Sequence, residues 1–532
     1  MGIHVWSFYD IFIRRRYWQS VVFMMATSSL RIAAILVVSD ILFVTHGLRT
    51  NNGRSFPKNF LLGVASSAYQ IEGGWNQDGK GVNVWDQWVH DHPDAIYDHS
   101  NGDVACDSYN KYKEDVQLLK EIGVDFYRFS LSWSRILPNG YSNVINYDGL
   151  NYYKNLIDEL LANGIKPFVT IYHWDHPNIF ESMGGWTNEL MVDWIADYAR
   201  VVFKELGPKV KYFMTINEPT ILCNEAYVTG EWAAGKKLGS TGKFLCLHNI
   251  LKAHAKIYHI YDEEFRKEQN GQIGIVTCCG GLFAKTPNDT AAVDTAFQFD
   301  CGVITSPIYS KTGDYPEVVK HHIAENSKLE GFSKSILPKF SPEWIHYIKG
   351  TSDFLGLNHY TSRLVETVPH VNGQAWYEYS GINMTIDPSW PLGGSKWLRV
   401  VPDGLQQIIT KLTKEYGRVP IYVSENGYSN IYDDINDDNR ISYLYSYMDK
   451  MLSAIYDDGC NVKGYTVWSL MDNFEWARGY SERFGIVHVN FTDPNRTRTP
   501  KSSMKWYKNV IQTRKLHNTS TLTDFEPVVI SV

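Results

Sequence analysis

The sequence lacks a strong charge of either sign, because 51 lysine and arginine residues against 58 aspartate and glutamate residues leave a net charge of −7. Nucleic acids and anionic membrane surfaces favour strongly basic proteins, so this balance excludes both as expected partners. The seven cysteines form no CxxC motif and no cluster with histidine at metal-ligand spacing, and we expect neither a metal nor a cofactor. Their odd number leaves at least one free thiol, and their pairing stays open.

The start of the sequence also lacks an apolar run long enough to span a bilayer comfortably. Ile32–Val44 is apolar apart from two residues, follows Arg31 and precedes a short polar stretch, which is typical of the core of a signal peptide. We therefore interpret residues 1–50 as a signal peptide or N-terminal extension and expect no membrane span in the mature protein. Met24 or Met25 would make a more regular start, so an over-extended gene model and a retained signal anchor stay open as alternatives.

Five Asn-x-Ser/Thr triplets agree with a secretory route, and we expect a secreted, extracellular glycoprotein. Such triplets also arise by chance, so they support this localisation without establishing it. The candidate glycosylation sites are Asn288, Asn383, Asn490, Asn495 and Asn518.

No linker, low-complexity run or sequence repeat divides the chain between Phe56 and Lys508. A short apolar strand, a turn and a helix-period segment recur instead, and eight such strands alternating with helices predict a parallel barrel. We predict one α/β domain, a single (β/α)8 TIM barrel with long βα loops, over residues 51–515, followed by a C-terminal tail over 516–532. The predicted strands are Phe60–Tyr69, Val124–Trp133, Ile165–Trp174, Val210–Pro219, Gln272–Cys279, Thr351–Tyr360, Pro420–Asn426 and Asn461–Leu470.

Polar side chains gather at the carboxyl ends of seven of these eight strands, and only the fifth strand, which ends at Cys278-Cys279, lacks one. A single buried histidine or asparagine is usually a satisfied core residue. Seven strands that deliver polar groups to one end of a barrel instead predict an active site, because this fold assembles its site there. The residues are Gln70, Arg128 with Ser130, His173, Asn217 with Glu218, Asn358 with Tyr360, Glu425 with Asn426, and Trp468.

Two glutamates at these strand ends indicate cleavage of a glycosidic bond. This reaction needs one acid to protonate the leaving oxygen and one carboxylate to attack the sugar, and Glu218 and Glu425 end opposite strands of the predicted barrel. Arg128 is expected to keep one of them ionised while the pKa of the other is raised; a structural ion pair with Arg128 is the alternative. The 17 Trp and 34 Tyr residues suit a carbohydrate ligand, although a Trp-rich core would also account for them.

Short motifs occur in a fixed order between Ser55 and Val510. They are Gly63-Val64-Ala65-Ser66-Ser67-Ala68-Tyr69-Gln70, Tyr127-Arg128-Phe129-Ser130, His173-Trp174-Asp175, Asn217-Glu218-Pro219, Ser424-Glu425-Asn426-Gly427 and Trp468-Ser469-Leu470-Met471-Asp472-Asn473-Phe474-Glu475-Trp476. Each motif is weak by itself, but the ordered set is specific and resembles glycoside hydrolase family 1. The stretch Arg478–Gly485 resembles insect members of that family in particular.

The resemblance implies a retaining β-glycosidase that hydrolyses β-D-glucosides, with galactosides and fucosides as further substrates, through a covalent glycosyl-enzyme. Its partner is then a small-molecule glycoside or oligosaccharide. Glu218 matches the acid/base of the family and Glu425 its nucleophile. Arg128 and Tyr360 match the pair that orients and charges the nucleophile, and Asn358 matches a residue beside the acid/base. The sugar is expected to lie on Trp468 and to be held by Gln70, His173, Asn217, Glu475 and Trp476.

Several residues expected near the mouth depart from the family pattern and leave the aglycone open: His176, Asn178, Cys278-Cys279 and the loop Ala226–Trp232. Trp397 is a candidate aglycone platform, or else a packed loop residue. A thioglucosidase (myrosinase) that acts on glucosinolates stays an alternative, because some insect relatives of this kind keep both glutamates; it would call for basic residues near the aglycone. A non-catalytic sugar-binding protein is the third hypothesis, and it is disfavoured because such relatives typically lose one of the two glutamates.

Overall fold

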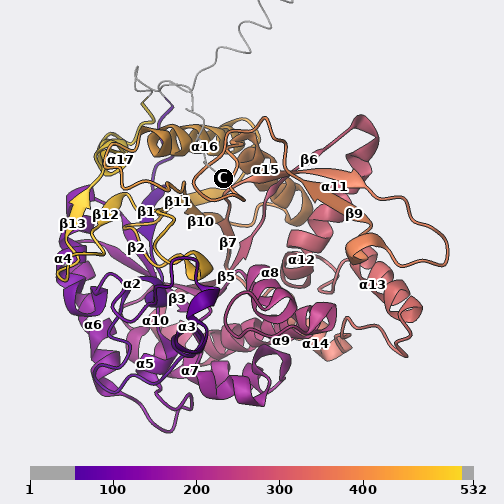
Figure 1. Cartoon of the computed structure of the whole chain (residues 1–532), viewed down its shortest axis with the longest axis horizontal. Helices are drawn as coiled ribbons and strands as arrows, with labels where there is room; N and C mark the ends of the chain where they lie inside the picture. Colours follow the sequence, from indigo (N-terminus) through magenta and orange to yellow (C-terminus); the bar gives the residue numbers. More distant parts are fainter. Residues whose placement is uncertain (1–53, 518–532) are drawn as a thin grey trace, which may run out of the picture. The chain divides into compact units, whose positions relative to one another are not determined.

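The computed structural model describes residues 54–517 of the chain (Figure 1). The predicted N-terminal segment 1–50, the triplet at Asn518 and nearly all of the predicted tail lie outside the described residues. Within the described part, no helix is both long enough and apolar enough to cross a membrane. The limits 51–515 of the catalytic domain stay a prediction.

Eight parallel strands close into a barrel, which confirms the predicted (β/α)8 fold (Figure 1). Each predicted strand falls on one barrel strand, and β1 pairs with β11 to close the ring. In the order around the barrel, the strands are β1 Leu61–Ala65, β11 Val462–Trp468, β10 Ile421–Asn426, β7 Phe354–Asn358, β5 Gln272–Cys278, β4 Tyr212–Asn217, β3 Lys166–Tyr172 and β2 Phe126–Ser130.

The observed strands are shorter than predicted, and this moves several polar residues off them. Gln70 does not end a strand, because β1 stops at Ala65 and Gln70 lies on the short helix α2, Ala68–Ile71. His173 and Glu218 directly follow β3 and β4, and Tyr360 lies two residues beyond β7. The apolar runs in the sequence are longer than the strands because the loops that follow the strands are also buried, at the barrel mouth.

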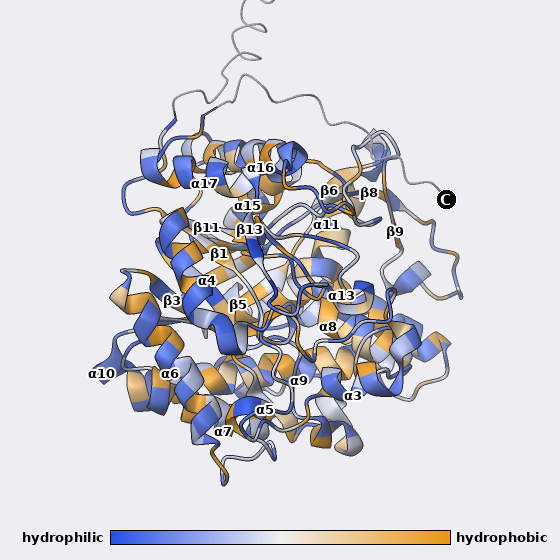
Figure 2. Cartoon of the chain, turned by 60° about the vertical axis from the view of Figure 1, so that its left-hand side comes forward, coloured by the Kyte–Doolittle hydropathy of each residue, from blue (hydrophilic) through white to orange (hydrophobic). Residues whose placement is uncertain are grey.

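Helices surround the barrel, and their mixed polar and apolar residues are visible along helices such as α4 and α6 in Figure 2. Helix α7 is a clear case, because its buried residues recur at helical spacing from Met191 to Leu206. Helix α14 begins as its sequence predicts: the Ser341 hydroxyl accepts the Trp344 backbone N–H at 3.3 Å, and proline occupies the first turn. The main outer helices are α4 Ser108–Ile122, α6 Tyr147–Ala162, α7 Met191–Leu206, α9 Gly239–Ile260, α14 Pro342–Ile348, α15 Asp403–Tyr416, α16 Asp438–Tyr456 and α17 Ser502–Thr513.

Long βα loops carry further elements, as predicted. A three-stranded sheet, β6 Gly281–Ala284, β8 Ser362–Thr367 and β9 Ile382–Thr385, lies in the loops after β5 and β7. Shorter elements in the loops and at the chain end are α3 Val84–Asp91, α5 Trp133–Ile136, α8 Pro219–Asn224, α10 Arg266–Gln269, α11 Thr290–Phe297, α12 Val303–Tyr309, α13 Glu317–Leu329, β12 Val487–Val489 and β13 Arg498–Pro500.

An aromatic plug fills the barrel at the level of the amino-terminal halves of the strands. Its buried members are Phe126, Phe168, Met214, Val276, Phe354 and Tyr422. Phe126 and Phe168 stack with ring centroids 4.2 Å apart. Because side chains two residues apart on a strand share a face, Arg128 follows Phe126 on the inside of the barrel, one layer nearer the mouth. The plug therefore forms a floor beneath the polar residues.

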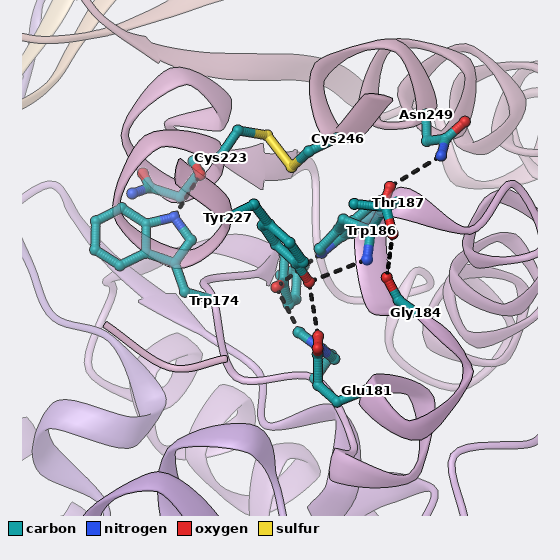
Figure 3. Close-up of a disulfide and its surroundings, with 12 residues drawn as sticks. Trp174, Glu181, Gly184, Trp186, Thr187, Cys223, Tyr227, Cys246 and Asn249 are labelled. Atoms are coloured by element: carbon teal, nitrogen blue, oxygen red, sulfur yellow. Dashed lines mark hydrogen bonds and ion pairs between the residues drawn. A yellow bond between two sulfur atoms is a disulfide. The ribbon is translucent and has the colours of Figure 1, made fainter. Parts of the chain in front are cut away.

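Two disulfides fix segments beside the barrel mouth, and they answer the pairing that the sequence leaves open. Cys223–Cys246 joins α8 to α9, and Cys279–Cys301 joins the residue after β5 to the turn Gln298–Gly302 (Figure 3 shows the first). All seven cysteines lie within the described residues, and Cys106, Cys278 and Cys460 are free.

Candidate active site

The two predicted catalytic glutamates occupy irregular backbone at the barrel mouth. Glu218 directly follows β4 and has a left-handed conformation with φ of 43°, while Glu425 lies on β10 just after Val423, where the register with β7 shifts. A second register shift falls between Met214 and Asn217, immediately before Glu218. Such irregularities re-aim side chains and are frequent beside active sites. Both residues are nearly fully buried, since 6% of the surface of Glu218 and 4% of the surface of Glu425 are exposed.

Two donors hold the Glu425 carboxylate. The Arg128 guanidinium forms an ion pair with one oxygen, and the Tyr360 hydroxyl donates to the other at 2.7 Å. Arg128 is fully buried and also donates to the Asn217 side-chain oxygen at 2.7 Å, so its position is fixed. A positive charge and a hydroxyl donor thus lie against this carboxyl group.

The surroundings of Glu218 have the opposite effect. Burial raises the pKa of Glu218 to about 8, and the nearby negative charge of Glu425 adds to the rise. The Asn358 amide donates to Glu218 at 2.6 Å and, with Arg128, limits the shift. The two glutamates therefore have different surroundings: Glu425 is paired with a buried cation, whereas the pKa of Glu218 is raised.

A cavity of about 560 Å³ opens above these two groups, and it receives most of the predicted site residues. Gln70, Arg128, Asn217 and Asn358 do not line it; they lie behind the wall and hydrogen-bond to residues that do. Trp397 lines the cavity and is 40% exposed, as an aglycone platform would be. The predicted site residues that line the cavity are His173, Glu218, Tyr360, Trp397, Glu425, Trp468, Glu475 and Trp476.

One part of the cavity wall combines three rings with the carboxyl group of Glu475. The imidazole of His173 lies nearly parallel to Trp468 and to Trp476, at centroid distances of 6.0 and 5.9 Å. The Gln70 amide donates to Glu475 at 3.3 Å. Burial raises the pKa of Glu475 well above its usual value, and the charges of Glu482, Glu425 and Glu218 add to the rise. Glu475 is therefore a group that holds a proton more readily than an ordinary glutamate.

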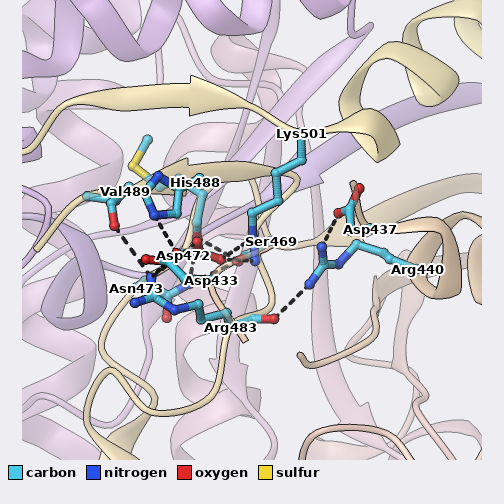
Figure 4. Close-up of polar contacts among 12 residues, drawn as sticks. Asp433, Asp437, Arg440, Ser469, Asp472, Asn473, Arg483, His488, Val489 and Lys501 are labelled. Atoms are coloured by element: carbon cyan, nitrogen blue, oxygen red, sulfur yellow. Dashed lines mark hydrogen bonds and ion pairs between the residues drawn. The ribbon is translucent and has the colours of Figure 1, made fainter. Parts of the chain in front are cut away.

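A buried ion pair supports the loop that carries Glu475 and Trp476 (Figure 4). Lys501 donates to Asp472 at 2.7 Å, and both side chains are at most 1% exposed. Asp472 also accepts the Gly485 backbone N–H at 3.0 Å. Removing one member of such a pair would leave a buried charge alone, which costs roughly 3–5 kcal/mol. The network therefore fixes the loop that forms one wall of the cavity.

Two of the departures from the family pattern do not lie at the mouth, and this part of the prediction is wrong. His176 is 1% exposed and does not line the cavity; it contacts the Tyr172 hydroxyl and Glu181, each at 2.8 Å. Glu181 in turn accepts the Tyr227 hydroxyl at 2.6 Å, in the network beside the first disulfide (Figure 3). Asn178 is absent from the cavity wall as well. Both residues follow strand β3, but neither side chain lines the cavity.

The other two departures from the family pattern do reach the cavity, through Cys278 and through Glu231 and Trp232. Further lining residues that the sequence did not predict include Glu225, Asp300, Arg363 and Met384. The strand register also explains the place of Cys278. It ends β5 in register with Asn358 at the end of β7, so it occupies the same position as the polar residues of the other strands.

A (β/α)8 barrel that places an arginine-paired carboxyl group and a second carboxyl group of raised pKa at one ring-lined cavity has the features of a glycoside-cleaving hydrolase. Comparison with known proteins agrees: residues 52–516 match glycosyl hydrolase family 1, and the chain belongs to this family.

The relatives differ in the activities that their names state. The chain is 45% identical over 472 residues to Myrosinase 1 of Brevicoryne brassicae, which covers 86% of this chain and 99% of that protein. It is 39% identical over 467 residues to the cytosolic beta-glucosidase of Homo sapiens, covering 87% and 99%. A solved structure of a rice beta-glucosidase mutant in a covalent complex with Glc matches with a TM-score of 0.80 at 35% identity, covering 87% and 99%.

Proposed function

We propose that this glycosidase is a retaining β-glucosidase with Glu425 as nucleophile and Glu218 as acid/base. The observation that carries the proposal is the contrast between the two carboxyl groups. Glu425 is charged by Arg128 and oriented by Tyr360, while burial beside Glu425 raises the pKa of Glu218 to about 8. A nucleophile must be ionised and a general acid protonated at the same pH, and this pair meets both requirements.

The proposed reaction has two steps. Glu425 attacks the anomeric carbon as the Glu218 proton passes to the leaving oxygen, which gives a covalent glycosyl-enzyme and the free aglycone. The negative charge of Glu425 is lost in this step, so Glu218 becomes easier to ionise. Glu218, ionised after giving up its proton, then takes a proton from a water molecule while the water oxygen attacks the anomeric carbon and displaces Glu425. The second displacement releases the sugar with its original β configuration. The rice beta-glucosidase mutant, solved in a covalent complex with Glc, supports such an intermediate in the family.

The sugar-holding role is proposed for the ring-lined wall. Trp468 offers a flat surface to a sugar ring, and Glu475, Trp476 and His173 border it. Asn217 donates to one ring nitrogen of His173 at 3.2 Å, and the other ring nitrogen is buried and has no partner among the described residues. Gln70 is proposed to act beside Glu475, which it contacts. Polar groups aimed at hydroxyls separate one sugar epimer from another.

The alternative, a thioglucosidase, finds less support in the charges of the cavity. A sulfated aglycone needs unpaired cations, and the wall offers Arg363 and Arg478, the second of which donates to Glu482 at 2.8 Å. Further acids on the wall, away from the proposed sugar-holding residues, include Glu225, Glu231 and Asp300. Their negative charges would repel a sulfate group. A non-catalytic protein is disfavoured because both glutamates are present and differ as catalysis requires.

A panel of 4-nitrophenyl β-glycosides and one glucosinolate, with anomeric products followed by NMR, tests this proposal. We expect β-glucose as the first product, with glucoside turned over faster than galactoside, fucoside or glucosinolate. Retention also predicts carboxyl groups about 5–5.5 Å apart, since no water needs to fit between nucleophile and sugar. An inverted first product would contradict the mechanism, and a preferred glucosinolate would contradict the substrate.

Variants of the two glutamates test the assigned roles. Glu425→Ala should abolish turnover, and azide or formate should restore part of it with an inverted product. Glu218→Ala should keep forming the glycosyl-enzyme from substrates with excellent leaving groups, because those need little protonation. If Glu218→Ala is equally slow with every leaving group, its role is misassigned.

We also propose that the protein is a secreted glycoprotein. The two disulfides favour an oxidising compartment, and Asn288, Asn490 and Asn495 are exposed. Asn383 is half-buried and donates to Glu366 at 2.7 Å, so it is the weakest candidate within the described residues. Expression in insect cells should deliver the protein to the medium, with a mass that falls after N-glycan removal. Full retention in the cells, or an unchanged mass, would contradict this proposal.

A further inference from the structure

Strand β5, for which the sequence predicts no polar residue at the barrel mouth, ends with a free thiol at the catalytic cavity. Cys278 lines the cavity, whereas the other two free cysteines, Cys106 and Cys460, are buried elsewhere. Glu218 lines the same cavity, and the Cys278 side chain lowers the pKa of its carboxyl group. Asn358, which ends the neighbouring strand β7, donates to this carboxyl group at 2.6 Å.

Backbone contacts fix this arrangement. The Glu218 N–H donates to the Val276 carbonyl at 3.0 Å, which holds Glu218 against β5. Cys278 pairs in register with Asn358 across the β5–β7 ladder. The next residue, Cys279, donates its backbone N–H to the Asn358 carbonyl at 3.1 Å and is bound to Cys301 by a disulfide. These backbone hydrogen bonds and the disulfide hold the segment that carries the thiol in place beside β4 and β7.

The pKa of the thiol decides which of the two groups can donate a hydrogen bond to the other. Burial raises the pKa of the Cys278 thiol well above its usual value, and the charges of Glu218, Asp300 and Glu425 raise it further, against the opposing effect of Arg363. The thiol is therefore a neutral donor instead of a nucleophile. A hydrogen bond from such a donor to the neighbouring Glu218 carboxyl would stabilise the ionised form of Glu218 more than the protonated form.

We propose that Cys278 is a positioning residue of the catalytic acid/base, which orients the Glu218 carboxyl and helps to set the pH range in which it acts as an acid. The inference rests on the proposed role of Glu218. Other charged or titratable groups also face Glu218, and they stay unchanged when the thiol is replaced: Arg128 from β2, Glu425 from β10, and Tyr360 and Glu475 from the loops after β7 and β11.

Two near-isosteric variants separate this role from a structural one. Cys278→Ser keeps a donor and makes it stronger, while Cys278→Val fills the site without any donor. The assay is kcat/KM against pH with an alkyl β-D-glucoside, whose poor leaving group requires the acid. Activity falls on the alkaline side as Glu218 loses its proton. The serine variant should move this fall to lower pH and the valine variant to higher pH, each by about half a unit, since a thiol is a weak donor.

Cys460→Ser serves as the matched control, because it replaces a free buried thiol at the start of β11, away from the cavity, and should leave the pH profile unchanged. If Cys278→Val does not fold, Cys278→Ala replaces it as the variant without a donor. Shifts in the same direction, or no shift in either variant, would overturn the inference. If instead Glu218→Ala is slow with all leaving groups, the proposed function fails, and the two failures are thereby distinguished.

Discussion

Replacing Glu475 by glutamine changes one atom of the proposed sugar-holding wall and leaves its shape intact. Glu475 lines the cavity beside Trp476 and accepts a hydrogen bond from Gln70 at 3.3 Å. We expect its carboxyl group to contact the O4 and O6 hydroxyls of the bound sugar. The variant keeps the size of the side chain but cannot become an anion.

The size of the effect follows from the ionisation of Glu475. A hydrogen bond to a charged group contributes about 1.5–3 kcal/mol and a neutral one about 0.5–1.5 kcal/mol. Because glutamine keeps a neutral contact, the variant loses the difference of about 1–1.5 kcal/mol, which at about 1.4 kcal/mol for each tenfold change lowers kcat/KM by roughly 5–12-fold. Because burial raises the pKa of Glu475, the wild-type group is protonated at low pH and ionises as the pH rises. The loss should therefore be small in acid and grow toward alkaline pH.

The assay measures kcat and KM of the wild type and the Glu475→Gln variant on 4-nitrophenyl glucoside and galactoside, from acid to alkaline pH. Because the charges of Glu475 and Glu218 interact, the pH profile of each protein is fitted with its own Glu218 pKa before the two are compared. Part of the loss should appear in kcat, because contacts to the sugar tighten toward the transition state. The glucoside and galactoside should suffer unequally, since O4 differs between them. If the variant keeps wild-type rates and selectivity at every pH, Glu475 has only a structural role.

Three further predictions concern the nucleophile, the acid and a disulfide. Tyr360→Phe removes the 2.7 Å hydrogen bond to Glu425 and should lower kcat/KM by about 10–150-fold with an unchanged unfolding temperature; wild-type kinetics would contradict the orienting role. In the wild type, kcat/KM should fall as the pH rises through about 8, because Glu218 must be protonated, and a Glu218→Gln variant should lack this fall. Replacing Cys223 and Cys246 by serine should lower the free energy of unfolding by about 3 kcal/mol, since the bond spans 23 residues, as thermal or urea unfolding can measure.

The sequence by itself determined the barrel and the two glutamates. Strands buried on both faces appear as apolar runs, and a polar residue that ends such a run is conspicuous, as with Glu425 after Val423. The alternation of strands and helices then permits few arrangements, so the closed barrel could be predicted. The ion pair of Arg128 with a glutamate was also foreseen, because a buried acid at that level needs a cation.

Only the tertiary structure decided which side chains meet, because these contacts join residues hundreds of positions apart. Gln70 lies on a helix and reaches Glu475, 405 residues away, although the sequence suggested a strand end. His176 turned out to be buried behind the wall, since the direction of a loop depends on what it packs against. The sequence marks Cys278 only as a departure from the family pattern, and its place next to Asn358 comes from the register of neighbouring strands.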